Sequence, residues 1–254
     1  MLIGIDIGNS FINIGFFTKE GLLVRKIKTH PLRSYETYTS LLKDLIAEIS
    51  IEKNTYEVII SSVVDSHTGI LAKACRDMVP EKLLIVGPGV KTGLIFDIPN
   101  PEQLGSDRIA NSVASYELYK RPVAVVDFGT ATTISIVGKD AHYLGGAILP
   151  GVTLMNKSLA NGTSKLAEVV LNPPRSALGI DTVSCIQSGL FYGTAGAVER
   201  VLNEIEKEVN LTLNTVITGG LSYIISKFLR REYELRPNLT LEGLEIIYQR
   251  NRNE

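Results

Sequence analysis

Leu2-Ile3-Gly4-Ile5-Asp6-Ile7-Gly8-Asn9-Ser10 and Val123-Ala124-Val125-Val126-Asp127-Phe128-Gly129-Thr130-Ala131 are two versions of one pattern. Each is an apolar, β-branched run that ends in an aspartate, an apolar residue, a glycine and a small residue, and a second β-rich run follows. This order predicts a strand, a tight turn and a returning strand. The aspartates are 127 − 6 = 121 residues apart in a chain of 254, so an internal duplication explains the spacing best. Two such hairpins on related halves would offer two carboxylates and two amide-rich turns to a metal-bound polyphosphate.

The bulk composition limits the class of protein. A chain of 254 residues, 44% of them hydrophobic and 21% charged, suits one large globular domain or two ordinary ones. A net charge of −1 favours neither nucleic acid nor an anionic membrane as a partner. Cys75 and Cys185 stand outside any CxxC spacing, and no apolar run approaches the roughly 20 residues that cross a bilayer. With no signal peptide recognised at the N-terminus, we expect a cytoplasmic protein.

Strand and helix patterns alternate along the chain. In the first half, strands are expected at 2–7, 11–16, 22–28, 57–61 and 83–86, and helices at 35–49, from 65 or 66 to 78, and from about 106 to 119. In the second half, a hairpin is expected at 123–138, strands at 141–148 and 213–218, and helices at 152–159, 182–209 and beyond 220. This alternation predicts α/β architecture with largely parallel sheets covered by helices. The boundary falls near 119–122, which gives two domains, 1–119 and 120–254.

The first carboxylate turn can serve a phosphate in two ways. Gly8 allows a turn whose N–H groups point at an anion, and the Asn9 and Ser10 side chains add neutral donors. Asp6 cannot bind phosphate directly, but it could hold Mg²⁺ through water. An ordinary hairpin turn is the alternative, and the second copy of the pattern argues against it.

The second half repeats this chemistry with hydroxyl groups. Asp127 could bind a cation, and the hydroxyls of Thr130, Thr132 and Thr133 could contact the terminal phosphates of a nucleotide. Glycine pairs at 145–146 and 219–220 would let the backbone come close to a ligand, although each pair alone also suits a plain loop.

Gly105-Ser106-Asp107-Arg108 is a different kind of motif, at the start of a helix after the Pro-rich link Asp97-Ile98-Pro99-Asn100-Pro101. The Arg108 guanidinium is a planar fork that suits a substrate carboxylate. Asp107 could accept a hydroxyl proton during phosphoryl transfer. The alternative is a surface helix whose first turn carries an aspartate that interacts favourably with the helix dipole.

Taken together, six motifs in this order resemble those of the type III pantothenate kinase family. They are Asp6-x-Gly8-Asn9-Ser10, Asn100-Pro101-x-x-x-Gly105-x-Asp107-Arg108, Asp127-x-Gly129-Thr130-Ala131-Thr132, Gly145-Gly146-x-x-x-Pro150-Gly151, Thr182-x-x-x-x-Gln187-Ser188-Gly189 and Thr218-Gly219-Gly220. The resemblance runs from residue 1 to about 225. Any one motif is modest support, but six in the family's order make coincidence very improbable.

The resemblance implies a fold and a reaction. The fold would be two duplicated actin-like (ribonuclease H-like) α/β domains with a nucleotide cleft between them. The reaction would be ATP-dependent phosphorylation of pantothenate to 4′-phosphopantothenate, the first step of coenzyme A synthesis, with Mg²⁺ and a monovalent cation, K⁺ or NH₄⁺. Family members are homodimers, and the helix beginning near Thr182 is the expected interface element.

The resemblance also implies roles for individual residues. Asp107 resembles the catalytic base, and the residues that resemble the pantothenate-binding set are Gly105, Ser106, Asp107, Arg108 and Thr182. The first phosphate loop is matched by Asp6, Ile7, Gly8, Asn9, Ser10, Phe11, Ile12 and Asn13. Thr130 resembles a residue that contacts ATP phosphate, and Asp127 resembles the monovalent-cation site.

Two positions differ from the family's usual pattern. Ile98 stands where a tyrosine is common, and Asp181 stands where asparagine is common before the threonine. Two other functions also remain open: a different actin-like phosphotransferase, such as a sugar kinase or exopolyphosphatase, and a non-enzymatic regulatory or nucleotide-sensing relative. The Gly105–Arg108 motif argues against the first, and the aspartates at 6, 107 and 127 argue against the second.

Overall fold

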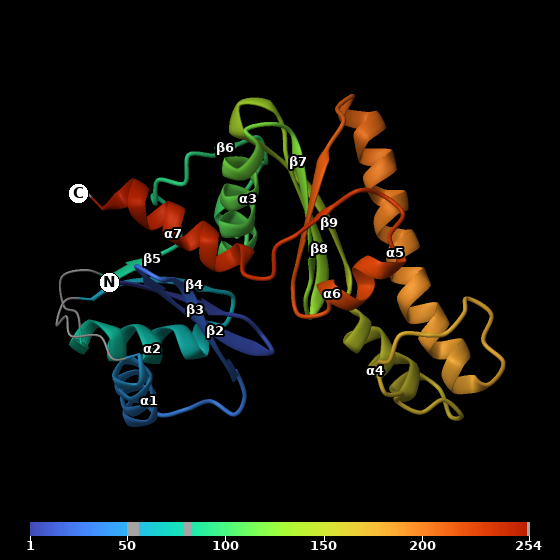
Figure 1. Ribbon diagram of the computed structural model, residues 1–254, viewed down its shortest axis with the longest axis horizontal. Coiled ribbons are helices and arrows are strands. Elements are labelled where there is room, and N and C mark those ends of the chain that lie inside the picture. The colour runs from blue at the N-terminus through green and yellow to red at the C-terminus, as the bar shows by residue number, and fades with distance from the viewer. Residues whose placement is uncertain (50–55, 79–82, 253–254) are drawn as a thin grey trace. The chain divides into compact units, whose positions relative to one another are not determined.

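The computed structural model describes residues 1–49, 56–78 and 83–252 (Figure 1). Its contacts divide the chain into two compact units. Unit 1 comprises Met1–Gly93, Pro99–Ala114 and Leu239–Glu254, and unit 2 comprises Leu94–Ile98 and Ser115–Asn238. The division differs from the expected halves, because the last residues of the chain pack with the first, and residues 94–98 and 115–119 belong to unit 2. Whether 1–119 and 120–254 are the domains of the protein stays a prediction.

Unit 1 is built on a five-stranded sheet in the order β3-β2-β1-β4-β5. Its strands are β1 (Leu2–Ile7), β2 (Phe11–Thr18), β3 (Gly21–Lys28), β4 (Glu57–Ser62) and β5 (Leu83–Ile85). The first three form an antiparallel meander, whereas β4 and β5 run parallel to β1. The expected hairpin and crossover strands are present, but the sheet is mixed rather than largely parallel, because β2 runs antiparallel to both β1 and β3.

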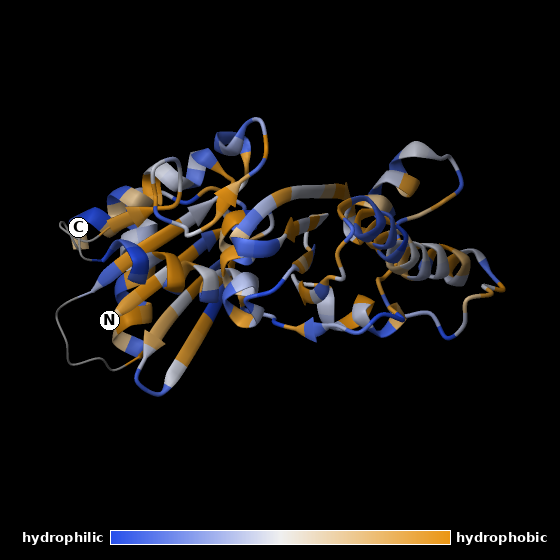
Figure 2. Cartoon of the chain, turned by 90° about the horizontal axis from the view of Figure 1, so that it is seen from above, coloured by the Kyte–Doolittle hydropathy of each residue, from blue (hydrophilic) through white to orange (hydrophobic). Residues whose placement is uncertain are grey.

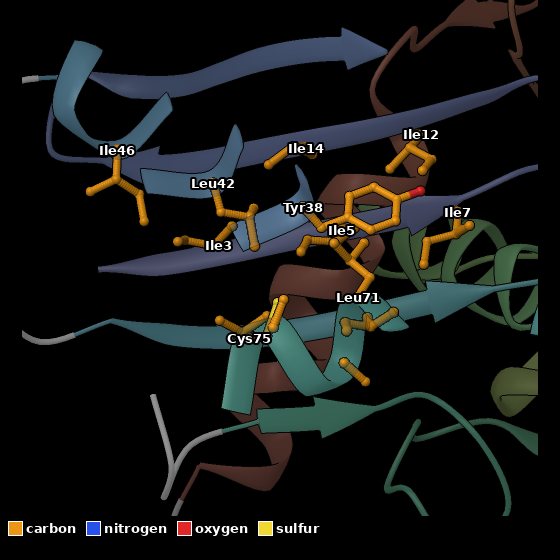
Figure 3. Close-up of a cluster of buried hydrophobic side chains, with 14 of the residues drawn as sticks. Ile3, Ile5, Ile7, Ile12, Ile14, Tyr38, Leu42, Ile46, Leu71 and Cys75 are labelled. Carbon is orange, nitrogen blue, oxygen red and sulfur yellow. The ribbon is translucent and has the colours of Figure 1, made fainter. Parts of the chain in front are cut away.

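The side chains of β1 alternate between the two faces of the sheet, and different helices cover the two faces. Ile3, Ile5 and Ile7 lie in one core cluster with the side chains of α1 (Tyr35–Glu48) and α2 (Asp65–Met78), as Figure 3 shows. Each such buried isoleucine contributes roughly 1.5–3 kcal/mol. Successive strand residues point to opposite faces, so Gly4 and Asp6 lie on the other side of the sheet.

That other face is covered by α7 (Leu239–Asn251), the last helix of the chain. A Cβ placed on Gly4 would lie 3.5 Å from a methyl group of Leu241, and one on Gly243 would overlap the backbone of Ala110. Helix α7 therefore packs on both the sheet and α3 (Ser106–Tyr119). Neither α7 nor the short strands β6 (Ile95–Phe96) and β11 (Glu234–Leu235) were expected from the sequence.

Unit 2 repeats the topology of unit 1. Its strands are β6, β7 (Val123–Phe128), β8 (Ala131–Val137), β9 (His142–Pro150), β10 (Asn214–Thr218) and β11, in the order β11-β10-β7-β8-β9-β6. Five of them, β9-β8-β7-β10-β11, match β3-β2-β1-β4-β5 in order and direction. Asp6 pairs with Ser61 in the first sheet, and Asp127 pairs with Thr218 in the second. The two aspartates therefore occupy equivalent positions.

Helices and short turns complete unit 2. They are α4 (Val152–Gly162), α5 (Thr182–Val209), α6 (Ser222–Ile225) and the 3₁₀ segments η2 (Lys139–Ala141) and η3 (Ser226–Phe228); a further 3₁₀ segment, η1 (Pro101–Gln103), belongs to unit 1. Phe128 of β7 and Phe191 of α5 are buried in the same core. Figure 2 shows hydrophobic residues in long runs along the strands.

The expected fold class is confirmed, and the expected strands and helices lie within a few residues of their places. Within the described ranges, we find no helix that is long and apolar enough to cross a bilayer.

Candidate active site

The first carboxylate turn is a short hairpin loop at the end of β1. Ile7 pairs with Ile12, and the Gly8 N–H donates to the Phe11 carbonyl at 3.0 Å. Asn9 and Ser10, between them, are exposed to solvent. The turn therefore presents two polar residues on a backbone fixed by the strands on either side.

Asp6 is held by side chains from both neighbouring strands. Its carboxylate accepts from Asn13 Nδ2 of β2 at 3.2 Å and from Ser61 Oγ of β4 at 3.3 Å. The residue is 8% exposed. Its two oxygens are thus oriented in advance, and one or two fixed carboxylates are what a largely hydrated Mg²⁺ ion needs from a protein.

Thr29, the residue that follows β3, holds the same turn in place through two hydrogen bonds. Its hydroxyl donates to the Gly8 carbonyl at 2.6 Å, and its backbone N–H donates to the Ser10 carbonyl at 3.1 Å. Thr29 is fully buried. Its role could not be predicted from the sequence, because a single threonine after a strand carries no signal until the register of β2 and β3 is known.

The Gly105–Arg108 segment begins helix α3. Ser106 is buried, and its hydroxyl faces the end of β4, where it accepts from the Ser62 N–H at 2.8 Å and lies 3.0 Å from the Ser62 carbonyl. Asp107 Oδ1 accepts from the Arg108 N–H at 2.8 Å. A Cβ on Gly105 would stand only 2.5 Å from Asp107 Oδ1. Glycine at 105 therefore leaves the space that this carboxylate occupies.

Burial changes the acidity of Asp107. Loss of solvent around the carboxyl raises its pKa above the usual aspartate value of 3.8, and the hydrogen bond from the Arg108 N–H opposes that effect. A raised pKa makes the ionised form a stronger base. The Arg108 side chain is half-buried beside it.

In unit 2, Asp127 lies among glycines. A Cβ on Gly219, whose φ is +95°, would overlap Asp127 Oδ1, and one on Gly129 would lie 3.3 Å from that oxygen. The Asp127 side chain is half-buried. Residues with side chains at these two glycine positions would crowd the carboxylate, so the glycines keep one side of it open.

Thr130 follows in an exposed turn between β7 and β8. The Gly151 N–H donates to its carbonyl at 3.1 Å, and a Cβ on Gly151 would stand 2.5 Å from the Gly129 carbonyl. The predicted Gly129-Thr130 and Pro150-Gly151 motifs are thus packed against each other. The exposed Thr130 side chain is placed where a ligand could reach it.

The comparison with known families decides between the possible phosphotransferases. Residues 2–204 match the type III pantothenate kinase family. The chain belongs to that family. The type III pantothenate kinase of Anaeromyxobacter dehalogenans (strain 2CP-C) is 39% identical to this chain over 256 residues, which cover 99% of this chain and 100% of the relative.

Solved structures agree on the fold. A protein from Campylobacter jejuni described as a Baf family transcriptional activator has a TM-score of 0.62 at 20% identity, covering 99% of this chain and 100% of the other. A ROK family glucokinase from Streptomyces griseus has a TM-score of 0.52 at 15% identity, covering 98% and 99%. At these identities the similarity concerns the fold alone. The kinase family's expected actin-like, sugar-kinase-like architecture is confirmed.

One departure from the pantothenate kinase family pattern has a structural explanation. Asp181 is the N-cap of α5, where its carboxylate accepts from the Ser184 N–H at 2.8 Å and Ser184 Oγ lies 3.1 Å from the Asp181 N–H. Hydrogen bonds from the Ser184 N–H and the Ser184 hydroxyl to the carboxylate lower the pKa of Asp181. Asparagine caps helices equally well, so the exchange keeps the start of the helix. Thr182, the first residue of α5, is exposed.

At the other departure, Ile98 is half-buried and 3.8 Å from where a Cβ on Gly145 would stand. The nearby Phe96 ring packs on the buried Tyr143 ring, with centroids 5.9 Å apart. This packing gives Phe96 a structural contact within unit 2.

Proposed function

We propose that this protein phosphorylates pantothenate with ATP and forms 4′-phosphopantothenate, the first step of coenzyme A biosynthesis. The observation that carries the proposal is the Asp107 carboxylate at the start of α3, beside Gly105 and with a raised pKa, in a chain of the type III pantothenate kinase family. Phosphoryl transfer depends mainly on positioning and on neutralising charge, and a fixed base at the acceptor hydroxyl supplies the first of these.

We assign to Asp107 the role of orienting the primary hydroxyl of pantothenate and accepting its proton. An alcohol is a far weaker acid than a carboxylic acid, so the proton moves late, as the bond to phosphorus forms. Only the ionised carboxylate can accept it. Activity should therefore fall on the acid side of a pKa that lies above the usual aspartate value.

Binding of the acceptor is assigned to the same segment and to α5. Arg108 offers a guanidinium for the pantothenate carboxylate, and Thr182 an exposed hydroxyl for the rest of the molecule. Gly105 and Ser106 shape the segment. The buried Ser106 hydroxyl faces Ser62, which supports a role in holding the loop.

Binding of ATP, the phosphoryl donor, is assigned to the residues around the turns that follow Asp6 and Asp127. Asp6 through Asn13 would form the first phosphate loop, and Thr130 would contact a phosphate oxygen. Mg²⁺ fits Asp6, because Asn13 and Ser61 hold the two oxygens of its carboxylate in place. An ion held by water, phosphate and one carboxylate needs no further protein ligand. When bound, Mg²⁺ would neutralise phosphate charge.

We assign the monovalent cation, K⁺ or NH₄⁺, to Asp127, which has glycines beside its carboxylate. Full activity in a buffer whose only monovalent cation is Na⁺ would refute this assignment. A large gain on adding K⁺, absent in Asp127→Ala, is the expected result.

A homodimer that acts in the cytoplasm completes the proposal. Leu178, Ile180 and Val183, near the start of α5, are each at least half exposed, and an apolar cluster of this kind suits a protein interface. Light scattering after gel filtration should give twice the mass of the chain, and Ile180→Asp should reduce that mass. A monomer at working concentration would contradict this part.

The experiment that tests the function measures ADP release with ATP, Mg²⁺ and K⁺ against a panel of acceptors. We expect release with pantothenate and background rates with glucose and with mannose. Polyphosphate without ATP should give no inorganic phosphate above background in a separate phosphate assay. Preference for a sugar would identify another actin-like phosphotransferase. No release with any acceptor, in protein that binds ATP, would favour a nucleotide-sensing role.

A further inference from the structure

A chain of hydrogen bonds inside unit 1 runs from the Asp6 carboxylate to the start of α3. Ser61 lies beside Asp6 in the register of β1 and β4, and its hydroxyl donates to Asp6 Oδ1 at 3.3 Å. The Ser61 and Ser106 hydroxyl oxygens are 3.0 Å apart. Ser106 Oγ also accepts from the Ser62 N–H at 2.8 Å. Ser61 is 0% exposed and Ser106 is 7% exposed, so these bonds are made away from bulk water.

Two hydroxyl hydrogens serve these contacts. Ser61 can donate to Asp6 or to Ser106, and Ser106 can donate to Ser61 or to the Ser62 carbonyl, 3.0 Å away. When Ser61 donates to Asp6 and Ser106 donates to Ser61, the donors point the same way, from the Ser62 N–H to the carboxylate. Bonds aligned in this way strengthen one another where water is excluded, and negative charge on Asp6 favours the alignment.

The chain joins two segments that the proposed reaction uses separately. Asp6 is the last residue but one of strand β1, just before the Gly8–Ser10 turn, and Ser106 immediately precedes Asp107. A shift of Ser106 would move the first turn of α3 and, with it, the carboxylate that Gly105 leaves room for. Reactions of this kind lose rate steeply when reacting groups are misplaced by an ångström.

We propose that Ser61 is a positioning residue that couples the Asp6 carboxylate to Asp107 through Ser106. The proposal rests on the proposed kinase function, because its consequence is the rate of phosphoryl transfer. Ser61 touches neither substrate in this account. It acts through the two residues whose geometry it fixes.

The test compares Ser61→Ala, Ser106→Ala and the double variant with wild type, and Ser112→Ala is the matched control. Ser112 is also a fully buried serine of unit 1, on α3, but its hydroxyl has no hydrogen-bond partner in the described structure. For each protein, kcat, both KM values and the Mg²⁺ concentration for half-maximal rate are measured. Amide exchange of the segment around Ser62 is measured as well.

We expect Ser61→Ala to lower kcat by about 10- to 100-fold and to raise the half-maximal Mg²⁺ concentration, because loss of an outer-shell partner typically costs that much. The fold losses in kcat caused by Ser61→Ala and by Ser106→Ala should not multiply in the double variant, whose loss should be smaller than their product. Ser112→Ala should match wild type. A kcat for Ser61→Ala within about twofold of wild type, or losses that multiply in full, would overturn the proposal.

Amide exchange separates this inference from the proposed function. Even if wild type phosphorylates no pantothenate, Ser61→Ala and Ser106→Ala should speed exchange at Ser62, whereas Ser112→Ala should not. Unchanged exchange in both variants would overturn the hydrogen-bonded chain itself. If Ser61→Ala does not fold, Ser106→Ala breaks the same chain from its other end, and the same criteria apply to it.

Discussion

Replacing Gly105 with alanine would displace the Asp107 carboxylate, and the structure gives the size of that displacement. The added Cβ would stand 2.5 Å from Asp107 Oδ1, and real Cβ atoms essentially never approach a neighbour within 3.0 Å. The carboxylate must therefore move by at least 3.0 − 2.5 = 0.5 Å, and by 0.9 Å to reach ordinary contact at 3.4 Å. Displacements of this size at a reacting group cost about 10- to 100-fold in kcat.

Stability should change much less than turnover. The displaced atom is the end of a side chain that can rotate, and the backbone of Gly105 has no positive φ that alanine would resist. We expect the free energy of unfolding to stay within about 1 kcal/mol of wild type.

The assay is steady-state ADP release with pantothenate, beside urea unfolding of the same preparations. Gly69→Ala is the matched control, because Gly69 lies in helix α2 with open space around its added Cβ. It should gain about 0.5–1 kcal/mol in stability and keep its kcat. A Gly105→Ala enzyme with wild-type kcat would refute the claim that the position of the Asp107 carboxylate limits turnover.

Three other changes have defined outcomes. Thr29→Val removes the hydroxyl that donates to the Gly8 carbonyl and should raise the KM for ATP about tenfold in initial-rate measurements. Thr29→Ser keeps a hydroxyl and should have the wild-type KM. Equal KM values in the two variants would contradict the role of this hydrogen bond. Asp181→Ala should lower the free energy of unfolding, measured in urea, by about 1 kcal/mol. Asp181→Asn should lower it by only a few tenths of a kcal/mol, because the amide can still cap α5. Similar losses in the two variants would show that capping by residue 181 does not stabilise the helix. Burial lowers the pKa of His67, so below the usual value of 6.5 the unfolded chain binds a proton more readily than the folded protein does. Its contribution to stability should be complete above pH 6.5 and decline as the pH falls below it, and urea unfolding of His67→Gln should lose that part of the pH dependence; an unchanged pH dependence would exclude His67 as its source.

The repeated pattern around Asp6 and Asp127 predicted the largest part of the fold. A β-branched run that ends in Asp-x-Gly specifies strand, turn and strand locally, and two copies specify two related sheets. The equivalent places of the two aspartates in the sheets, beside Ser61 and Thr218, confirm that interpretation. Local sequence was sufficient here because period-two alternation and turn chemistry act over a few residues.

Long-range packing was harder to predict. Helix α7 belongs with the first sheet although it is last in the chain, and the reason lies in Gly4 and Gly15 of β1 and β2, whose missing side chains make room for Leu241. The contributions of Ser61 and Thr29 depend on register, since each acts on a residue that is distant in sequence. One signal was present: Val58-Ile59-Ile60-Ser61 and Val216-Ile217-Thr218 are both apolar runs that end in a hydroxyl residue.

The most direct test of the central claim compares pantothenate-dependent ADP release, with the product mass determined, in wild type and Asp107→Asn. Wild type should form ADP and 4′-phosphopantothenate in equal amounts. In Asp107→Asn, turnover should fall by about 10²- to 10⁴-fold. Its free energy of unfolding at neutral pH should be no lower than that of wild type, because a raised pKa means that the ionised carboxylate costs stability there. Turnover near the wild-type value in folded Asp107→Asn, or no 4′-phosphopantothenate from wild type with Mg²⁺ and K⁺ present, would contradict the account.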